Sequence, residues 1–515
     1  SFRSMSQRVV RRIPFLPLSS AAVAALGLAA SAAQAQTARG GTGLRTQTPA
    51  YVAQPRAEDA SQANPGATGV NPSAGPQEPP AGVSQRAPPR ASSPVQAAAT
   101  RGVTQRQFRA PQPVVTGLPA TPEPVAPPRR RPAVEEDPYA PLGLRLGSVT
   151  LRPAITNSIG YDTNPQRVSG APRNGSAFSR HEGEIGVQSD WNVHELTGQL
   201  RGGYFNYFRD SDASRPDADG TLALRLDATR DTRILLETRA RLDTQRPGSP
   251  DLNAPVQGRP QIYQYGGSAG VSHDINRLQL TLRGSVDRSD YEDATLTNGA
   301  KLSQKDRNQT QYGVRLRASY ELTPGLRPFI QGEADTRQFD QARDSSGYAR
   351  SSTGLTGRVG STFELSRLVT GEISVGYQDR AYDDNRLKNL RGLVGDAAVI
   401  WQPTPLTTVT LRGTSELGDT TIAGSSGTTA RRATLEVAHA LRRNLTVTGF
   451  GSISRTDYEG QGLREDLASY GARLDYKLTR SVSIRASFTQ ERLISTAQGS
   501  DYTANIAQVG LRLQF

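Results

Sequence analysis

The sequence predicts an all-β fold, an antiparallel up-and-down transmembrane β-barrel of about 18 strands, between about 16 and 20, behind a disordered arm. Three observations predict it. Apolar and polar residues alternate through residues 142–515, short and long connections alternate between these stretches, and the chain ends on Phe515 after the alternating "QVGLRLQF". Because side chains of a strand point alternately to its two faces, each of these strands has one apolar face.

The first residues are expected to form a targeting signal and a disordered arm rather than part of the barrel. Residues 1–35 resemble a secretory signal peptide, with basic residues before the apolar stretch 21–30 and a small-residue cleavage site at 33–35; Met5, the only methionine, is an alternative start. Residues 36–141 are rich in Pro, Ala, Gly and Gln, which cannot bury enough apolar surface to fold. They are expected to form a disordered periplasmic arm, either a solvated tether or a contact for partners.

Composition excludes several classes of protein. The net charge is +13, but basic residues mostly lie near acidic ones, so we expect no nucleic-acid partner. The chain has no cysteine, which excludes disulfides, thiolate metal sites and cysteine nucleophiles. Beyond the N-terminus there is no apolar run of about 18 residues, so a bundle of membrane helices is also excluded.

The alternation identifies the strands one by one. In "TLALRLD", Leu222, Leu224 and Leu226 share a face, opposite Arg225 and Asp227. These stretches show no apolar stripe with the helical spacing i, i+3, i+4. Strands are expected to begin near residues 148, 177, 193, 217, 232, 261, 277, 308, 325, 350, 368, 388, 405, 429, 444, 465, 481 and 501.

The connections predict the orientation. Short turns, such as 190–193, 229–233 and 478–481, alternate with long polar loops, such as 245–261 and 289–308. Outer-membrane barrels have tight periplasmic turns and long extracellular loops. An even number of strands therefore places both termini in the periplasm.

Aromatic residues are expected to form a girdle at each membrane interface. The periplasmic girdle comprises residues beside short turns or at the chain end: Trp191, Tyr320, Phe363, Trp401, Tyr476 and Phe515. The opposite girdle comprises residues toward the long loops: Tyr204, Tyr207, Tyr263, Tyr291, Tyr382 and Tyr458.

At this point the sequence resembles proteobacterial outer-membrane barrels, in which the last strand ends on an aromatic residue read by the barrel assembly machinery. The resemblance implies that Val509, Leu511, Leu513 and Phe515 are this signal, and that periplasmic chaperones and the assembly machinery are partners. The stretch "AITNSIGYDTNP", 154–165, resembles the start of a family of putative beta-barrel porins over about residues 142–515. Membership would imply passage of solutes.

The face opposite the apolar one would line the lumen. A barrel of about 16 to 18 strands is wide enough for an aqueous channel, so we expect a porin-like protein for passive diffusion of small polar or ionic solutes, with a slight preference for anions. These charges could equally pair across strands and stiffen the wall. The candidate lumen residues are Arg225, Asp227, Glu237, Arg283, Arg315, Arg317, Glu372, Arg412, Glu436, Arg473, Asp475, Arg485, Glu491 and Arg512.

No catalytic, cofactor or metal site is expected, and the protein is not expected to be an enzyme. The histidines His181, His194, His273 and His439 are not joined by a nucleophile and an orienting group. The Asp-rich stretches 209–220 and 382–385 are expected to be loop tips that bridge surface lipopolysaccharide through metal ions. Alternative functions are a barrel of a polysaccharide-export or envelope system, whose arm docks periplasmic partners, and an adhesin-like surface protein. Homo-oligomers are possible.

Overall fold

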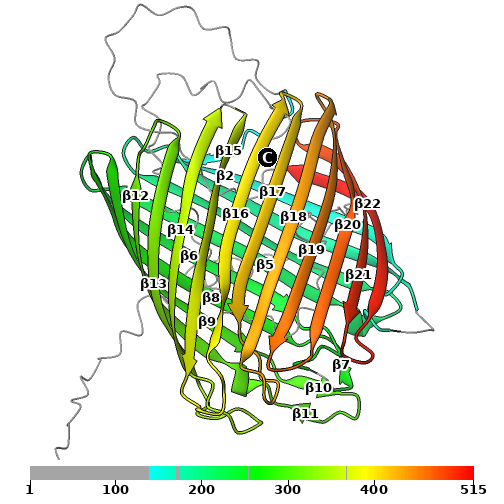
Figure 1. The fold of residues 1–515 in the computed structure, drawn as a ribbon. Helices are drawn as coiled ribbons and strands as arrows, with labels where there is room; N and C mark the ends of the chain where they lie inside the picture. The colour runs from blue at the N-terminus through cyan, green and yellow to red at the C-terminus, as the bar shows by residue number, and fades with distance from the viewer. Residues whose placement is uncertain (1–137, 170–173, 253, 367) are drawn as a thin grey trace, which may run out of the picture. The chain divides into compact units, whose positions relative to one another are not determined.

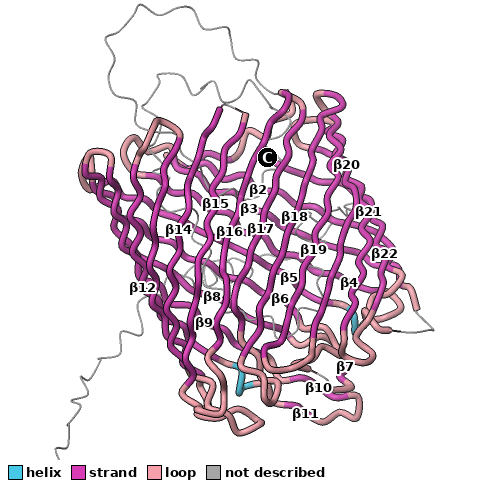
Figure 2. The backbone as a smooth tube through the Cα atoms, in the orientation of Figure 1, coloured by secondary structure: helices cyan, strands magenta, loops and turns pink. Residues whose placement is uncertain are grey.

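The computed structural model describes residues 138–169, 174–252, 254–366 and 368–515, which form one closed antiparallel barrel of 18 strands (Figures 1 and 2). The fold class predicted from the sequence is therefore confirmed. The predicted signal peptide and arm lie outside the described residues.

The wall strands follow one another in chain order, each paired with the next. They are β2 (Val149–Asp162), β3 (Ser176–Ser189), β4 (Glu195–Tyr207), β5 (Arg215–Asp227), β6 (Thr232–Thr244), β8 (Gln261–Ile275), β9 (Leu278–Tyr291), β12 (Gln309–Tyr320), β13 (Leu326–Phe339), β14 (Ser352–Ser366), β15 (Val369–Tyr382), β16 (Leu390–Thr404), β17 (Thr407–Gly418), β18 (Gly427–Arg442), β19 (Leu445–Glu459), β20 (Arg464–Lys477), β21 (Val482–Ser495) and β22 (Tyr502–Gln514). Each begins within two residues of its predicted start. Pairing of β22 with β2, from Ala154 opposite Gln514 to Asp162 opposite Ile506, closes the ring.

Smaller elements lie at the ends of the barrel. At the short-turn end, β1 (Leu144–Leu146) pairs with the first residues of β2. At the long-loop end, β7 (Val256–Gln257), β10 (Ala294–Leu296) and β11 (Lys301–Leu302) form a separate three-stranded sheet (Figure 1). A short 3-10 helix, η3 (Ser211–Ala213), lies between β4 and β5, and a second, η4 (Lys305–Arg307), lies between β11 and β12.

Among the described residues, no helix is long and apolar enough to span a bilayer.

The two faces of the wall have opposite chemistry. Apolar side chains such as Ile330, Leu393 and Ile453 point outward and are about 65% exposed, whereas alternate positions carry buried polar residues such as Thr281 and Ser469. An exposed apolar face this extensive is destabilising in water and stable against hydrocarbon. Every one of the 18 wall strands also pairs on both sides, as a bilayer demands of the backbone.

Phenylalanines cover glycines on neighbouring strands inside the barrel. Phe450 lies opposite Gly471 in the pairing of β19 with β20, and the pairs Phe329/Gly360 and Phe178/Gly160 repeat the arrangement. A Cβ added to Gly471 would lie 2.8 Å from the Phe450 ring and 2.0 Å from a carbonyl oxygen. Each ring therefore needs the missing side chain beneath it, which fixes the register of the two strands.

We expect Gly471→Ala to lower the free energy of unfolding by about 1–3 kcal/mol, because the added methyl group overpacks this site. The urea midpoint of the heat-modifiable folded band measures it. Gly451→Ala is the matched control on β19, since a Cβ there meets no atom within 4 Å. Equal midpoints for the two variants would show that ring packing does not set the register.

Candidate functional site: the lumen and its long-loop mouth

The candidate lumen residues all lie on the inward face of the wall. Seven are buried and the others are half-buried, whereas their outward neighbours are mostly exposed apolar residues. The buried ones are Arg225, Arg283, Arg317, Arg473, Asp475, Arg485 and Glu491; the half-buried ones are Asp227, Glu237, Arg315, Glu372, Arg412, Glu436 and Arg512.

Ion pairs link these residues along the wall. Arg315 and Glu333 face each other directly in register and are 2.9 Å apart. Other pairs cross one or more intervening strands, as in Arg317–Glu372 at 2.8 Å from β12 to β15. Further pairs, within one strand or between strands, are Arg225–Asp227 at 3.1 Å, Arg225–Glu195 at 2.9 Å, Arg283–Glu237 at 3.3 Å, Arg473–Glu436 at 2.6 Å, Arg485–Asp475 at 2.7 Å, Arg512–Glu184 at 2.6 Å and Arg167–Glu491 at 2.8 Å.

Ion pairing reduces the electric field that these charges produce at a distance. A guanidinium and a carboxylate in contact present a dipole to a passing ion, and the field of a dipole falls off faster with distance than that of a single charge. The inner wall is therefore polar, and its paired charges largely cancel one another's field at a distance.

The loop between β6 and β8, residues 245–260, reaches three other loops at the mouth. Arg246 donates a 2.8 Å hydrogen bond to the carbonyl of Ser500, between β21 and β22, and Arg259 donates one of 2.7 Å to the carbonyl of Pro165, between β2 and β3. Asp251 accepts from the Thr420 hydroxyl at 2.7 Å, between β17 and β18. Because β6 and β17 lie nearly opposite each other in the ring, this loop crosses the mouth.

A second set of contacts holds the loop between β17 and β18, residues 419–426. Asp419 pairs with Arg337 of β13 at 2.6 Å and accepts from Gln309 of β12 at 3.1 Å. Arg350, after β13, donates to the carbonyls of Ser425 and Ile422 at 2.9 and 3.0 Å. We call the contacts of Asp419, Arg337 and Arg350 the mouth clamp. It ties the loop between β17 and β18 to β13 and to the loop that follows β13.

Burial and charge shift the pKa values of the loop residues. Burial would raise the pKa of Asp419, but Arg337 and Arg380 nearby outweigh it and hold the pKa below the usual value. Burial, together with the neighbouring charges of Arg215 and Arg167, lowers the pKa of Arg259 to about 9. Both groups are therefore charged at pH 7, and the mouth clamp is intact there.

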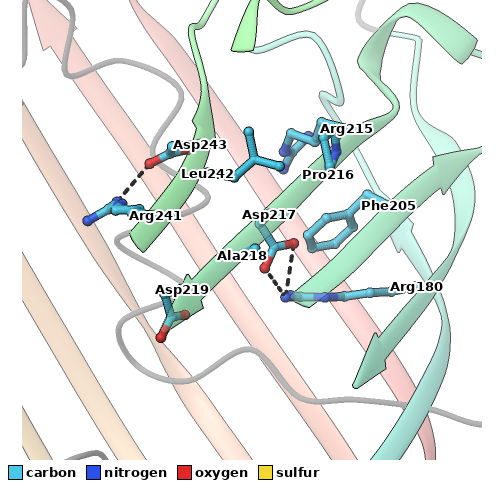
Figure 3. Close-up of a pocket in the computed structure, with 10 residues that line it drawn as sticks. All are labelled: Arg180, Phe205, Arg215, Pro216, Asp217, Ala218, Asp219, Arg241, Leu242 and Asp243. Carbon is cyan, nitrogen blue, oxygen red and sulfur yellow. Dashed lines mark hydrogen bonds and ion pairs between the residues drawn. The ribbon is translucent and has the colours of Figure 1, made fainter. Parts of the chain in front are cut away.

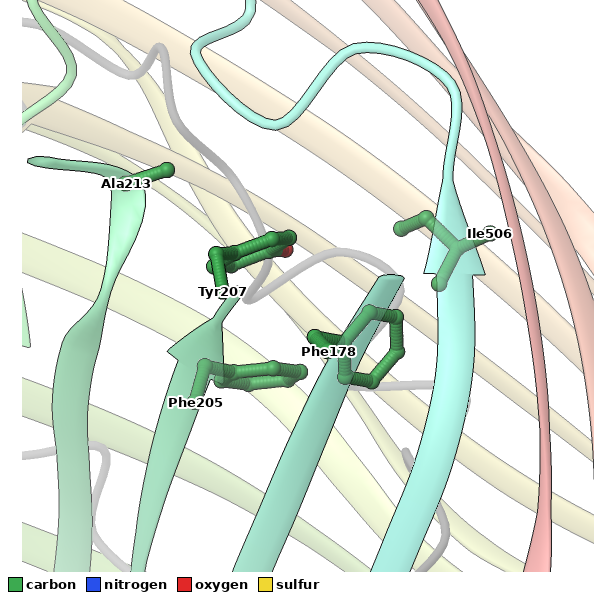
Figure 4. Close-up of a cluster of buried hydrophobic side chains, with 5 residues drawn as sticks. All are labelled: Phe178, Phe205, Tyr207, Ala213 and Ile506. Atoms are coloured by element: carbon green, nitrogen blue, oxygen red, sulfur yellow. The ribbon is translucent and has the colours of Figure 1, made fainter. Parts of the chain in front are cut away.

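An apolar cluster and a pocket lie inside the wall near the mouth. Phe178, Phe205, Tyr207, Ala213 and Ile506 pack together, with ring centroids 5.4 to 6.3 Å apart (Figure 4). The adjoining pocket is lined by residues of both charges from β3 to β6 (Figure 3). They are Arg180, Phe205, Arg215, Pro216, Asp217, Ala218, Asp219, Arg241, Leu242 and Asp243. Arg180 lies 4.2 Å from the Phe205 ring and 2.9 Å from Asp217.

Part of the predicted long-loop aromatic girdle is wrong. Tyr204 and Tyr263 are exposed, but the other four lie on the inward parity of their strands: Tyr207, Tyr291 and Tyr458 are buried, and Tyr382 is half-buried. Their closeness to the long loops suggested a girdle. Whether a side chain points outward, however, depends on which face of the strand carries it. Parity relative to the exposed neighbour Tyr204 would have separated Tyr207 from it.

The segment 209–220 is only partly a loop, which corrects a second prediction. Arg215 begins β5, and Asp217 and Asp219 point inward to Arg180 and Arg201. The other Asp-rich stretch, 382–385, does follow β15 as a loop. Among the described residues, no group of three His, Asp or Glu side chains is placed to hold a metal ion.

The short-turn end carries the remaining predicted residues. Tyr320, Trp401, Tyr476 and Phe515 are exposed; Phe363 is half-buried, and Trp191, also half-buried, donates to the Ser148 hydroxyl at 2.8 Å. The proposed assembly signal lies in β22: Val509 is exposed, and Leu511 and Leu513 are half-buried on the same face.

The histidines lie apart from one another. His273 and His439 are next to short turns, each with Nδ1 2.9 Å from a threonine hydroxyl. His181 contacts Asn157, and His194 accepts from the backbone N–H of Asp227 at 3.2 Å. These contacts are those of exposed imidazoles on the outer wall and in a turn.

Comparison with known proteins gives a family. The profile of the family described as "Putative beta-barrel porin 2" matches residues 137–515. No curated protein sequence matches the chain. Among solved structures, OccAB3 of Acinetobacter baumannii has 12% identity over 71% of this chain and 99% of that chain, with a TM-score of 0.36.

Two further structures are similar at the same level. The siderophore receptor PirA of Acinetobacter baumannii has 10% identity over 70% of this chain and 80% of that one, with a TM-score of 0.34. The FrpB iron transporter of Neisseria meningitidis, F3-3 variant, has 11% identity over 67% of this chain and 62% of that one, with a TM-score of 0.37.

We expect acid to release the mouth clamp. Because the folded-state pKa of Asp419 is depressed, its stabilisation is complete above the ordinary carboxyl pKa of about 4 and is lost as pH falls through the lower folded value. If the barrel conducts, the open probability in planar bilayers should rise as pH falls below about 4. Asp419→Asn should already raise it about tenfold at pH 7, because Arg337 loses its carboxylate.

Asp340→Asn is the matched control, since Asp340 pairs with Arg288 on the outer face and its side chain is 44% exposed. It should leave the pH response of the current unchanged. An identical acid response in Asp419→Asn and in the native chain would show that another group closes the mouth.

Proposed function

Since the chain belongs to the putative beta-barrel porin 2 family of outer-membrane barrels, we propose that it passes small polar or ionic solutes by passive diffusion through its lumen. The observation that carries this proposal is the polar, ion-paired inner face of a closed wall of 18 strands. Barrels of 16 to 18 strands have room for water inside, whereas barrels of eight strands fill with side chains.

The mouth sets an upper limit to the solute. Loops 245–260 and 419–426 lie across the long-loop end, held by Arg246, Asp251 and Asp419. Solutes that pass must fit between these loops, so the proposed cargo is small. Pairing of the wall charges favours weak ion selectivity rather than the anion preference that the net charge of the sequence indicated.

The same mouth contacts favour a second candidate from a different class. A mouth crossed by loops that buried ion pairs hold in place also suits a barrel that opens only when a partner engages it, as an export or envelope-assembly component would. In that case the arm, residues 36–141, would dock the partner. No constellation of nucleophile and base supports an enzyme, and a non-enzymatic role remains part of the proposal.

Single-channel recording on the purified, folded full-length chain tests the proposal. Stable steps on the order of one nanosiemens, with a small reversal potential in a salt gradient, are expected from a water-filled lumen of this width. Glu333→Gln should shift the anion-to-cation permeability ratio upward about twofold, because Arg315 then lacks its carboxylate. Arg315→Gln should shift it in the opposite direction.

The double variant Arg315→Gln/Glu333→Gln is the control, because it removes both charges and should restore the native ratio. A folded, heat-modifiable barrel that remains silent at neutral and acid pH would exclude passive diffusion and favour the partner-gated export role. Current steps whose anion-to-cation permeability ratio is the same in both single variants as in the native chain would place the conducting path away from Arg315.

We also propose that the long loops are extracellular and both termini periplasmic. The two ends of the wall lie on one side, since Phe515 N donates to the carbonyl of Pro153 at 3.2 Å beside β1. The chain has no cysteine, so single cysteines report position cleanly. A membrane-impermeant maleimide on intact cells should label Thr297→Cys, in the turn between β10 and β11, and leave Asn192→Cys unlabelled until the outer membrane is opened. The reverse pattern would invert the orientation.

A further inference from the structure

Two polar side chains lie on the outer side of the wall, along the middle of β2 and β3. Asn157 and His181 are opposite each other in the pairing of the two strands, and Nδ1 of His181 is 2.5 Å from Oδ1 of Asn157. Asn157 has the outward parity of its exposed neighbours Ile155 and Ile159, and His181 is itself exposed. The pair therefore points away from the lumen.

This pair lies within the hydrocarbon-facing part of the wall and not at the level of the headgroups. The outward residues of β2 on the two sides of Asn157 are apolar or aromatic: Leu151, Pro153 and Ile155 toward the short turns, and Ile159 and Tyr161 toward the long loops. The stretch 151–161 has the length that a tilted strand needs to cross the hydrocarbon core, and Asn157 is near its middle. Water is absent at this depth, so it cannot supply hydrogen bonds.

The pair leaves one acceptor and one donor without a partner. An amide oxygen can only accept, so Nδ1 of the neutral imidazole carries the proton and Nε2 of His181 is an acceptor. The hydrogens on Nδ2 of Asn157 are donors. Among the described residues, neither of these two nitrogens has a hydrogen-bond partner. In hydrocarbon such groups are costly unless another molecule supplies the partners.

The wall beside the pair allows close approach of a second surface. Gly183, the next outward residue of β3, lies opposite Gly202 of β4, and a Cβ added to Gly183 would meet no atom within 4 Å. The nearby Ile155 and Leu200 are 54% and 52% exposed. Two positions without side chains thus lie side by side next to protruding apolar residues, and small residues let backbones approach each other within a membrane.

A second outward glycine pair has no such polar neighbour. Gly332 of β13 lies opposite Gly357 of β14, and a Cβ added to either would meet no atom within 4 Å. Exposed residues around this pair, such as Ile330 and Leu355, are apolar. Hydrocarbon solvates that surface fully, so small residues alone do not demand a protein partner.

We propose that the outward face of β2 to β4 binds a second copy of this chain, in a twofold dimer within the membrane. We call Asn157, His181, Gly183 and Gly202 the dimer face. About a twofold axis along the membrane normal, Nδ2 of Asn157 in each protomer donates to Nε2 of His181 in its partner, and the glycine surfaces meet beside this contact. The inference does not depend on whether the barrel conducts or on which end is extracellular.

The donor and the acceptor favour a second copy over other occupants of this face. Acyl chains offer neither group, and the headgroups of both leaflets lie about half of the core thickness away from Asn157. An unrelated barrel would need its own acceptor and donor at the same depth and spacing. A second copy carries both by symmetry.

Disulfide cross-linking of the full-length chain in outer membranes tests the proposal, because the chain has no cysteine of its own. Gly183→Cys should give a covalent dimer on oxidation, since the twofold axis brings the two new thiols together. Leu355→Cys is the matched control: Leu355 is 64% exposed on β14, on the far side of the ring. It should give less than about a tenth of that dimer, because its thiols do not come within bonding distance.

Native mass spectrometry of the folded full-length chain measures the strength of the contact. The native chain should appear at twice the protomer mass, and Asn157→Leu/His181→Leu should weaken dimerisation about tenfold, because the hydrogen bonds between protomers are lost. Thr407→Val/His439→Leu is the matched control, since this outward pair, 2.9 Å apart, lies beside a short turn where water is available. It should leave the dimer unchanged.

A third variant keeps the polar pair and blocks close approach. Gly183→Leu should also weaken dimerisation about tenfold, while its folded, heat-modifiable band stays native because the added Cβ meets no atom within 4 Å. Gly332→Leu, equally open on β13, should leave the dimer intact.

Three results would overturn the proposal. One is a native chain that is monomeric both in membranes and in the mass spectrum. Another is a dimer that neither Asn157→Leu/His181→Leu nor Gly183→Leu weakens. The third is a trimer, in which each copy uses two different faces, or a cross-link from Gly183→Cys to a different membrane protein in place of the dimer.

Discussion

The structure depends on closure of the backbone hydrogen-bond network between β2 and β22. An unpaired strand edge inside hydrocarbon leaves its N–H and C=O groups unsatisfied at a cost of several kcal/mol each. Pairing of Ala154–Asp162 with the last strand removes both edges. Because consecutive strands are antiparallel, an even ring also brings the beginning and the end of the wall to the same rim, where Phe515 N donates to the Pro153 carbonyl of β2.

Closure gives every wall strand an inner and an outer face, and charged residues are paired differently on the two faces. Inside, arginines lie within about 3 Å of carboxylates across one or more strands, as in Arg317–Glu372, because partners are available all along the wall. Outside, hydrocarbon offers no partner, so charges occur only at the headgroup level, as Arg391–Asp379 does.

A ring of this width cannot fill its own interior with wall side chains, and the long loops occupy part of the remaining space. Loop 245–260 crosses the mouth to Thr420 and Ser500, and Asp419 ties loop 419–426 to Arg337. These contacts concentrate buried charge in segments that are free of the strand pairing. The mouth is therefore the part of the barrel whose structure can change while the wall stays closed, which is where control of passage is expected.

Much of the wall can be derived from the sequence alone. The strand starts and the faces of Leu222 and Arg225 follow from a period of two that is local in the chain, and the alternation of short turns with long loops is visible in it directly. Tertiary structure decided the rest. Partners such as Asp251 with Thr420, or Arg246 with Glu465, are separated by nearly half of the ring, and no local pattern encodes which loops meet. The inward position of Tyr458 depends on the face of its strand, and the position of Arg431 directly opposite Arg455 depends on the register of β18 and β19. Strand pairing fixes both only once the barrel closes.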